Sequence, residues 1–324
     1  MKSKFKNLLC LLIPLSLILS GCTNSNNTSS SSNNSDDTLN IVTSFYPIYI
    51  STLNVIKDVP NVELTNMTKA QTGCLHDYEL TPQDLKTLDK ADVFVINGAG
   101  MESFLDKIIS QFNSMDIIDS SSNISLIESA EDHDHDSEEH NHDSEEHDHD
   151  HEENPHVWVS ISKNIQQVQN IADGLSKIDP NNADKYQANA TEYIDKLKVL
   201  QTKMHEELDS LPNRNIITFH EAFPYFAEEF NLNIVGVIQV EPDSEPSAKE
   251  IESVIETIKS NNVKALFTEP QYSSKTAETI AKETGTKVYT LDPIVTGDAT
   301  KNAYNDYIDK MENNLNILKE ALQW

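Results

Sequence analysis

The stretch DKYQANATEYIDKLKVLQTKMHEEL, residues Asp184–Leu208, decides the fold of this chain. Its apolar side chains recur every three or four positions, at Tyr186, Ala190, Tyr193, Leu197, Leu200, Met204 and Leu208. This period predicts one amphipathic helix of roughly 27 residues, or about 40 Å, within residues 181–210. A coiled-coil dimer is the alternative, but about four heptads with tyrosines in the seam disfavour it. We therefore expect a monomer in which one long rigid helix joins two lobes.

Short apolar runs alternate with helical patterns on both sides of this helix. The predicted strands cover residues 39–45, 62–67, 93–96, 115–118, 215–219, 233–238, 263–268 and 287–291. The predicted helices begin at residues 47 and 82 and cover residues 101–112, 163–178, 222–230, 248–259, 275–282 and 303–322. Thr81 followed by Pro82, and Ser247 followed by Glu250, are typical of helix starts. This alternation predicts an α/β fold with mainly parallel sheets flanked by helices, in lobes 38–180 and 211–324.

The first residues have the pattern of an exported lipoprotein. Lysines at positions 2, 4 and 6 precede an apolar run over residues 8–19, and Leu19-Ser20-Gly21-Cys22 follows. We interpret residues 1–21 as a signal peptide, Cys22 as the lipidated residue and residues 22–37 as a flexible tether. An ordinary signal peptide that contains a cysteine is the alternative. We expect a protein anchored in the bilayer through acylated Cys22, on the extracytoplasmic face of the cell membrane.

The charge of the chain indicates what it can bind. The formal net charge is −29, and it is still −16 without the thirteen carboxylates of residues 131–153. This balance argues against a nucleic-acid partner and suits a cation. After loss of the signal and lipidation of Cys22, Cys74 is the one remaining thiol, so we expect no internal disulfide.

Residues 131–153 form a tract of histidine interleaved with aspartate and glutamate. It contains the segment HDSEEH twice, and its seven histidines are His133, His135, His140, His142, His147, His149 and His151. Such a composition lacks residues that could build a core, so we predict a disordered loop with low-affinity metal sites. A solvated acidic loop without function is the alternative.

Four other residues follow predicted strands or precede helix starts. They are His76, His156, His220 and Asp292. In open α/β sheets ligands bind at the carboxyl ends of strands, so these residues from two lobes predict one fixed metal site. Three imidazoles and one carboxylate suit Zn²⁺ in near-tetrahedral geometry.

Five motifs carry a resemblance to a known family. They are GCLHDYELTPQDLKTLDKADVFVINGAGMESFL (73–105), NPHVW (154–158), FHEAFPYF (219–226), FTEPQYSS (267–274) and YTLDP (289–293). In this order they resemble the zinc-binding solute-binding lipoproteins of bacterial ABC importers. The resemblance implies Zn²⁺ as transported ligand, an ABC permease as partner, and His76, His156, His220 and Asp292 as ligands. Manganese-type relatives carry glutamate in place of His220 and lack the tract.

The chain departs from the family pattern at three positions. Cys74 lies two residues before His76, and we expect a lone buried thiol there, with approach to the metal as the alternative. Asn154 and Ser160 stand where the family often has aspartate, which leaves the orientation of His156 undetermined.

Other functions remain open at this point. A hydrolytic zinc enzyme is one, with Glu221 and Glu269 as its candidate bases, but no HExxH motif occurs, so we expect no enzyme. A manganese-binding or adhesin-type lipoprotein of the same family is another. A zinc buffer that acts through the histidine tract is the third.

Overall fold

The computed structural model describes residues 38–75, 78–105, 112, 114–129, 153–238 and 246–323, which lie within one compact unit, Asp37–Trp324. The predicted signal peptide, Cys22, the tether, His76 and the seven histidines of the tract lie outside the described residues. Among the residues described, no helix combines the length and apolarity needed to span a bilayer.

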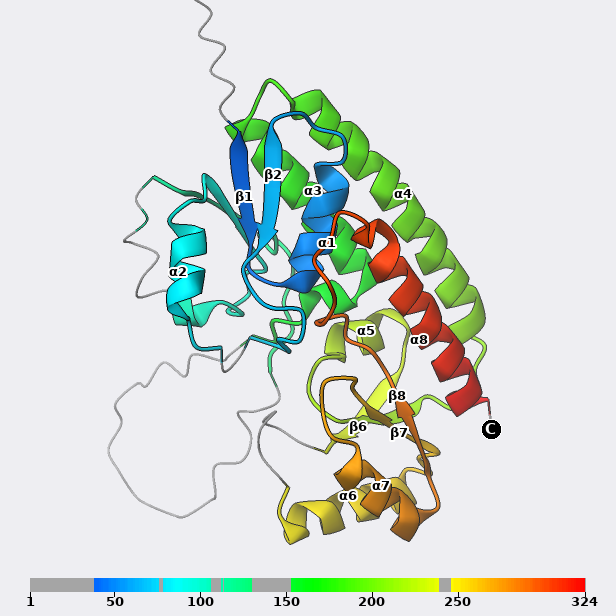
Figure 1. Cartoon of the computed structure of the whole chain (residues 1–324). Helices are drawn as coiled ribbons and strands as arrows, with labels where there is room; N and C mark the ends of the chain where they lie inside the picture. The colour runs from blue at the N-terminus through cyan, green and yellow to red at the C-terminus, as the bar shows by residue number, and fades with distance from the viewer. Residues whose placement is uncertain are drawn as a thin grey trace, which may run out of the picture. The chain divides into compact units, whose positions relative to one another are not determined.

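The first lobe contains a four-stranded parallel sheet in the order β2-β1-β3-β4, in which β1 and β2 lie side by side (Figure 1). Its strands are β1 (Leu39–Thr43), β2 (Val62–Asn66), β3 (Val93–Ile96) and β4 (Asp116–Asp119). Helix α1 (Tyr46–Val55) follows β1 and is buried along its whole length. Helix α2 (Pro82–Leu88) begins with the predicted cap, because Thr81 Oγ1 accepts from Asp84 N while the Asp84 carboxylate accepts from Thr81 N.

The second lobe repeats this arrangement. Its strands are β5 (Asn215–Thr218), β6 (Asn233–Val237), β7 (Ala265–Thr268) and β8 (Lys287–Thr290). They are all parallel, in the order β6-β5-β7-β8. Its helices are α5 (Pro224–Glu229), α6 (Ala248–Ser260), α7 (Lys275–Thr284) and α8 (Asp306–Leu322). The same strand order in both lobes confirms the predicted α/β fold with two parallel sheets.

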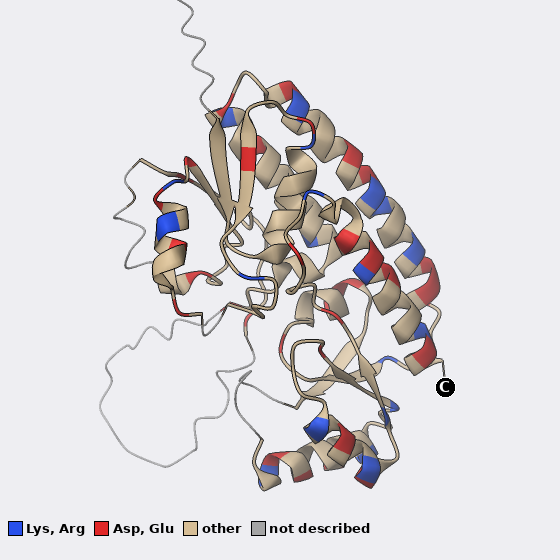
Figure 2. Ribbon diagram, viewed as in Figure 1, with Lys and Arg blue, Asp and Glu red and all other residues tan. Residues whose placement is uncertain are grey.

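The long helix is α4 (Ala183–Leu208), which follows α3 (Ile161–Ile178) and leads into the second lobe. All seven apolar residues of its predicted stripe are 3% exposed or less. They face α1, α3 and α8, and α8 lies alongside α4 (Figure 1). The outer face of α4 carries charges of both signs (Figure 2), and Glu192 there pairs with Lys196 and with Lys57. The structure therefore confirms one amphipathic helix that packs against both halves of the chain.

The observed boundaries differ from the predicted ones in a few places. Of the helix predicted over residues 101–112, the structure describes the first turn, the 3₁₀ segment Ser103–Leu105, and residues 106–111 lie outside the described part. Helix α5 begins at Pro224, two residues later than predicted, because proline is favoured in the first turn. Helix α3 begins two residues earlier than predicted, at Ile161, because Ser160 caps it.

Candidate metal centre

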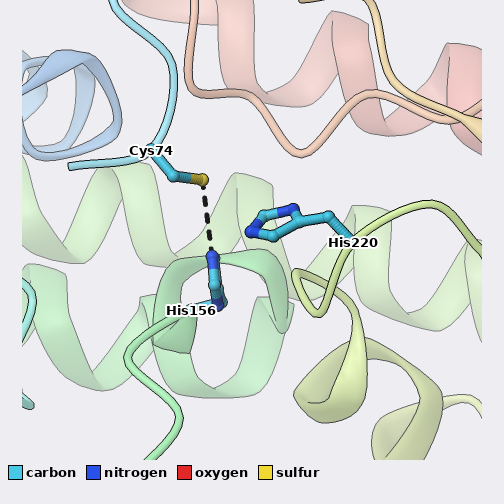
Figure 3. Close-up of side chains that lie close together, drawn as sticks. All are labelled: Cys74, His156 and His220. Carbon is cyan, nitrogen blue, oxygen red and sulfur yellow. Dashed lines mark hydrogen bonds between the residues drawn. The ribbon is translucent and has the colours of Figure 1, made fainter. Parts of the chain in front are cut away.

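Three metal-ligating side chains from distant segments converge in the structure (Figure 3). They are Cys74, between β2 and α2, His156, just before the 3₁₀ segment Val157–Val159, and His220, two residues after β5. One ligand atom of each lies within 4.8 Å of the others. The structure thus brings together two of the four predicted ligands and adds a sulfur atom.

The ring of His156 is fixed by a neighbour in its own loop. His156 is 1% exposed, and its Nδ1 lies 3.0 Å from Asn154 Oδ1. An amide oxygen only accepts hydrogen bonds, so Nδ1 carries the proton and Nε2 is the nitrogen that could bind a metal. That Nε2 atom lies 3.4 Å from Cys74 Sγ. Asn154 therefore orients the ring although it stands where the family often has aspartate.

The loop that carries His156 is bound to both lobes. In the first lobe, Asn97 Nδ2 donates to Pro155 O at 2.9 Å. From the second lobe, the Tyr225 hydroxyl donates to Asn154 O at 2.7 Å, and Asn154 Nδ2 donates to Glu221 O at 2.9 Å. Because these backbone and amide groups are paired across the lobes, the position of His156 depends on the packing of both.

Ser160, the other departure near this loop, has a structural role. Its Oγ accepts from Lys163 N as the cap of α3 and donates to Glu229 Oε2 at 2.6 Å. Glu229 also accepts from Ser162 N and from Gln201 Nε2 of α4. Ser160 thus links the start of α3 to Glu229 of α5, and Glu229 in turn links both helices to α4.

The ring of His220 is held by a carboxylate from the neighbouring strand. His220 and Glu269 are each 2% exposed, and His220 Nδ1 lies 3.1 Å from Glu269 Oε1. A carboxylate accepts from this nitrogen, which turns Nε2 toward Cys74 and His156 (Figure 3). Glu269 directly follows β7, which pairs with β5. The strand-end rule that selected His220 therefore also selects Glu269, which the sequence analysis treated only as a candidate base.

Burial and neighbouring groups shift the pKa values of His220 and Cys74. Burial alone lowers the pKa of His220, but the Cys74 sulfur and the Glu269 carboxylate outweigh burial and raise it well above its usual value. Burial raises the pKa of the Cys74 thiol, and nearby His220 opposes that increase. The site therefore favours a proton or another cation between these groups.

Cys74 is a free thiol, but it is not isolated as expected. The side chain is partly buried, and its sulfur contacts His156 within the group of possible ligands. Nothing in the local sequence distinguishes the two possibilities, because His156 and His220 are 82 and 146 positions further along the chain.

Asp292 does not belong to this group among the described residues. Its Oδ2 lies 2.5 Å from Lys310 Nζ, and its Oδ1 accepts from Ile294 N at 2.7 Å. His76, two positions after Cys74, lies outside the described residues. The ligand roles of all four residues thus stay predictions, and the structure brings two of them, His156 and His220, together.

Two relatives in sequence extend over most of the chain. High-affinity zinc uptake system protein ZnuA of Bacillus subtilis is 35% identical over 312 residues, which cover 94% of each protein. Zinc-binding protein AdcA of Streptococcus pyogenes is 33% identical over 289 residues, or 87% of this chain. The chain spans only 55% of the length of that AdcA.

Solved structures share the fold. A crystal structure of ZnuA has a TM-score of 0.74 and 30% identity, covering 88% of this chain and 100% of the other. FpvC from Pseudomonas aeruginosa, solved in complex with Mn²⁺, also has a TM-score of 0.74, with 28% identity, covering 88% of this chain and 97% of FpvC. The family model described as "Zinc-uptake complex component A periplasmic" matches residues 41–321. With its two parallel-sheet lobes and this match, the chain belongs to the zinc-uptake complex component A (ZnuA) family.

Proposed function

We propose that this protein captures Zn²⁺ outside the cytoplasm and delivers it to the membrane permease of an ABC importer. The observation that carries the proposal is the convergence of two buried imidazoles, His156 and His220, on the Cys74 sulfur. Each ring is held at Nδ1 by a neighbouring side chain, which directs its other nitrogen toward the group. Membership of the ZnuA family supports zinc uptake as the role of this site.

The donor types favour zinc over manganese. Imidazole nitrogen and sulfur are borderline or soft donors, whereas Mn²⁺ prefers oxygen. The fold alone does not choose the metal, since FpvC was solved with Mn²⁺. Zinc as cargo therefore rests on the side chains of this chain, to which the sequence adds His76 as a third imidazole.

Asp292 is the carboxylate that the sequence predicts for the fourth position. Because its Oδ2 is engaged by Lys310 at 2.5 Å, it would have to exchange an ammonium group for the metal. This engagement makes Asp292 the least supported of the four predicted ligands.

We also propose that the protein has no enzymatic activity. The family is one of metal-binding solute-binding proteins. Glu269, a candidate base of the enzyme alternative, is buried and accepts from His220 and from Gln271 Nε2. A carboxylate committed to two donors inside the protein is poorly placed to take a proton from a substrate.

The anchor and the tract complete the proposal. Acylation of Cys22 would anchor the protein at the extracytoplasmic surface of the membrane. We expect the anchored protein to be a monomer. The tract histidines would collect zinc weakly near the fixed site, since a tethered segment raises the local concentration of its ligand.

Competition titration with a zinc chelator tests the proposed function. The wild-type protein is expected to bind one Zn²⁺ tightly and further ions weakly. His156→Ala and His220→Ala should each lose the tight site, whereas His205→Ala, a partly exposed residue of α4 paired with Asp209, should retain it. A wild-type protein with weak sites only would overturn capture at the lobes and favour the buffer function.

A further inference from the structure

We propose that Cys74 ligates the captured zinc ion through its sulfur, and that it takes the position assigned to Asp292. This inference rests on the proposed function, because it specifies the donor set of the same site. It adds a thiolate to imidazole donors and thereby changes the chemical class of the centre from nitrogen–oxygen to nitrogen–sulfur.

The first argument is distance. In a tetrahedral zinc site with a Zn–N bond of about 2.0 Å and a Zn–S bond of about 2.3 Å, bound nitrogen and sulfur atoms lie about 3.5 Å apart. The structure places Cys74 Sγ 3.4 Å from His156 Nε2, and His220 completes the group within 4.8 Å. Zinc would need only small side-chain movements to bind all three atoms.

The second argument is how the cysteine is anchored. Leu75, the next residue, is 0% exposed and belongs to the main hydrophobic core. Burial of this side chain fixes the backbone beside Cys74. The position of the Cys74 sulfur is therefore set by the packing of the neighbouring residue in the core.

The third argument is the contrast with Asp292. Cys74 Sγ contacts a histidine of the site, whereas both Asp292 oxygens are engaged by Lys310 and Ile294. The Lys310 and Asp292 side chains are only 25% and 16% exposed, and Asp292 could bind a metal through Oδ2 only if Lys310 moved away. Cys74 is therefore better placed than Asp292 to bind a metal together with His156 and His220.

Binding would proceed by exchange of a proton for the metal. The S–H bond of Cys74 breaks, a Zn–S bond forms and the proton leaves to solvent, so the oxidation state of zinc and sulfur is unchanged. A thiolate ligand favours Zn²⁺ over Mn²⁺. The site would then reject manganese by its sulfur donor as well as by His220.

Cobalt substitution tests this ligand directly. Because the chain has three cysteines, Cys10→Ala and Cys22→Ala leave Cys74 as the one thiol. Co²⁺ bound to this protein should show an intense near-ultraviolet sulfur-to-metal charge-transfer band. The band should vanish in Cys74→Ser and persist in Asp292→Asn. Cys74→Ser should also weaken Zn²⁺ binding by roughly 100-fold or more, because loss of outer-shell partners alone costs roughly 10–100-fold.

X-ray absorption of the zinc-loaded parent protein gives a second measurement that needs no Cys74 variant. A sulfur scatterer at about 2.3 Å supports the proposal, and a shell of nitrogen and oxygen alone overturns it. Tight binding of one Zn²⁺ without sulfur would refute the ligand but keep the proposed function. Failure of the parent protein to bind Zn²⁺ tightly would refute both.

Discussion

The two lobes have the same strand order but hold their histidines by different means. In the first lobe a neutral amide, Asn154, accepts from His156. In the second lobe a buried carboxylate, Glu269, accepts from His220. Both fix a ring and its tautomer, but only the carboxylate adds negative charge beside the site. Asn154 in the first lobe therefore only fixes the position of its histidine ring. Glu269 in the second lobe fixes its ring and also places a negative charge next to it.

The largest effect is expected when His220, the imidazole held by the Glu269 carboxylate, is replaced. His220→Glu should weaken Zn²⁺ binding by roughly 100-fold or more and narrow the gap to Mn²⁺, because an oxygen donor replaces a nitrogen donor and faces Glu269. Chelator competition with both metals measures this preference. His205→Glu is the matched control, and zinc affinity that is the same in both variants would exclude His220 from the site.

A smaller loss is expected when the carboxylate behind His220 is neutralised. Glu269→Gln should weaken Zn²⁺ binding by roughly 10–100-fold, the range for partners of metal-bound histidine. Glu283→Gln is the control, because it removes the same unit of negative charge at an exposed position of α7. Equal affinities of the two variants would show that total charge, and not the contact with His220, attracts the metal.

The same variant should change the pH dependence of binding. Glu269 helps to raise the pKa of His220, so in the wild type a proton competes with zinc up to a higher pH than at ordinary histidine. In Glu269→Gln the pKa falls, and the loss of zinc on acidification should begin at lower pH. Fewer protons should also be released per zinc bound at pH 7, which an indicator dye in weak buffer measures. Unchanged proton release would contradict the charge role of Glu269.

The fold was predictable from the sequence because its signals are local. The stripe of α4 and the cap at Thr81 depend on residues within a few turns of one another, and both occur as predicted. The site was predictable only in part. His220 follows a predicted strand and His156 precedes a predicted helix, so both could be selected from the sequence. The contact of Cys74 with His156 and the ion pair of Asp292 with Lys310 of α8 depend on how distant segments pack.

A substitution of Asn154, the neutral partner of His156, should affect the stability of the protein more than its zinc affinity. Asn154 Nδ2 donates to Glu221 O across the lobes, and in Asn154→Asp an oxygen would face that carbonyl oxygen in a buried place. The free energy of unfolding of the metal-free protein should fall by about 1–3 kcal/mol. Zinc affinity should fall less than in Glu269→Gln, because the new carboxylate still accepts from His156. Urea unfolding, with exposed Asn181→Asp as control, measures the first effect. A variant as stable as the control would show that the bond across the lobes contributes nothing.

The smallest effect on the tight site is expected from the histidine tract, which lies between Cys74 and His156 in the sequence. Deleting Asp132–Glu152 removes the seven tract histidines and ends four residues before His156. Loosely held ligands must order their backbone to bind, so their affinity should lie well below that of imidazoles held by Asn154 and Glu269. The deletion should therefore abolish the weak sites in a chelator titration and leave one tight site with unchanged affinity. Uptake in cells should suffer chiefly when zinc is scarce, when local collection matters most. Loss of the tight site in the deletion protein would mean that tract histidines bind the captured ion, and the contrast between amide-held and carboxylate-held imidazoles would no longer describe the whole centre.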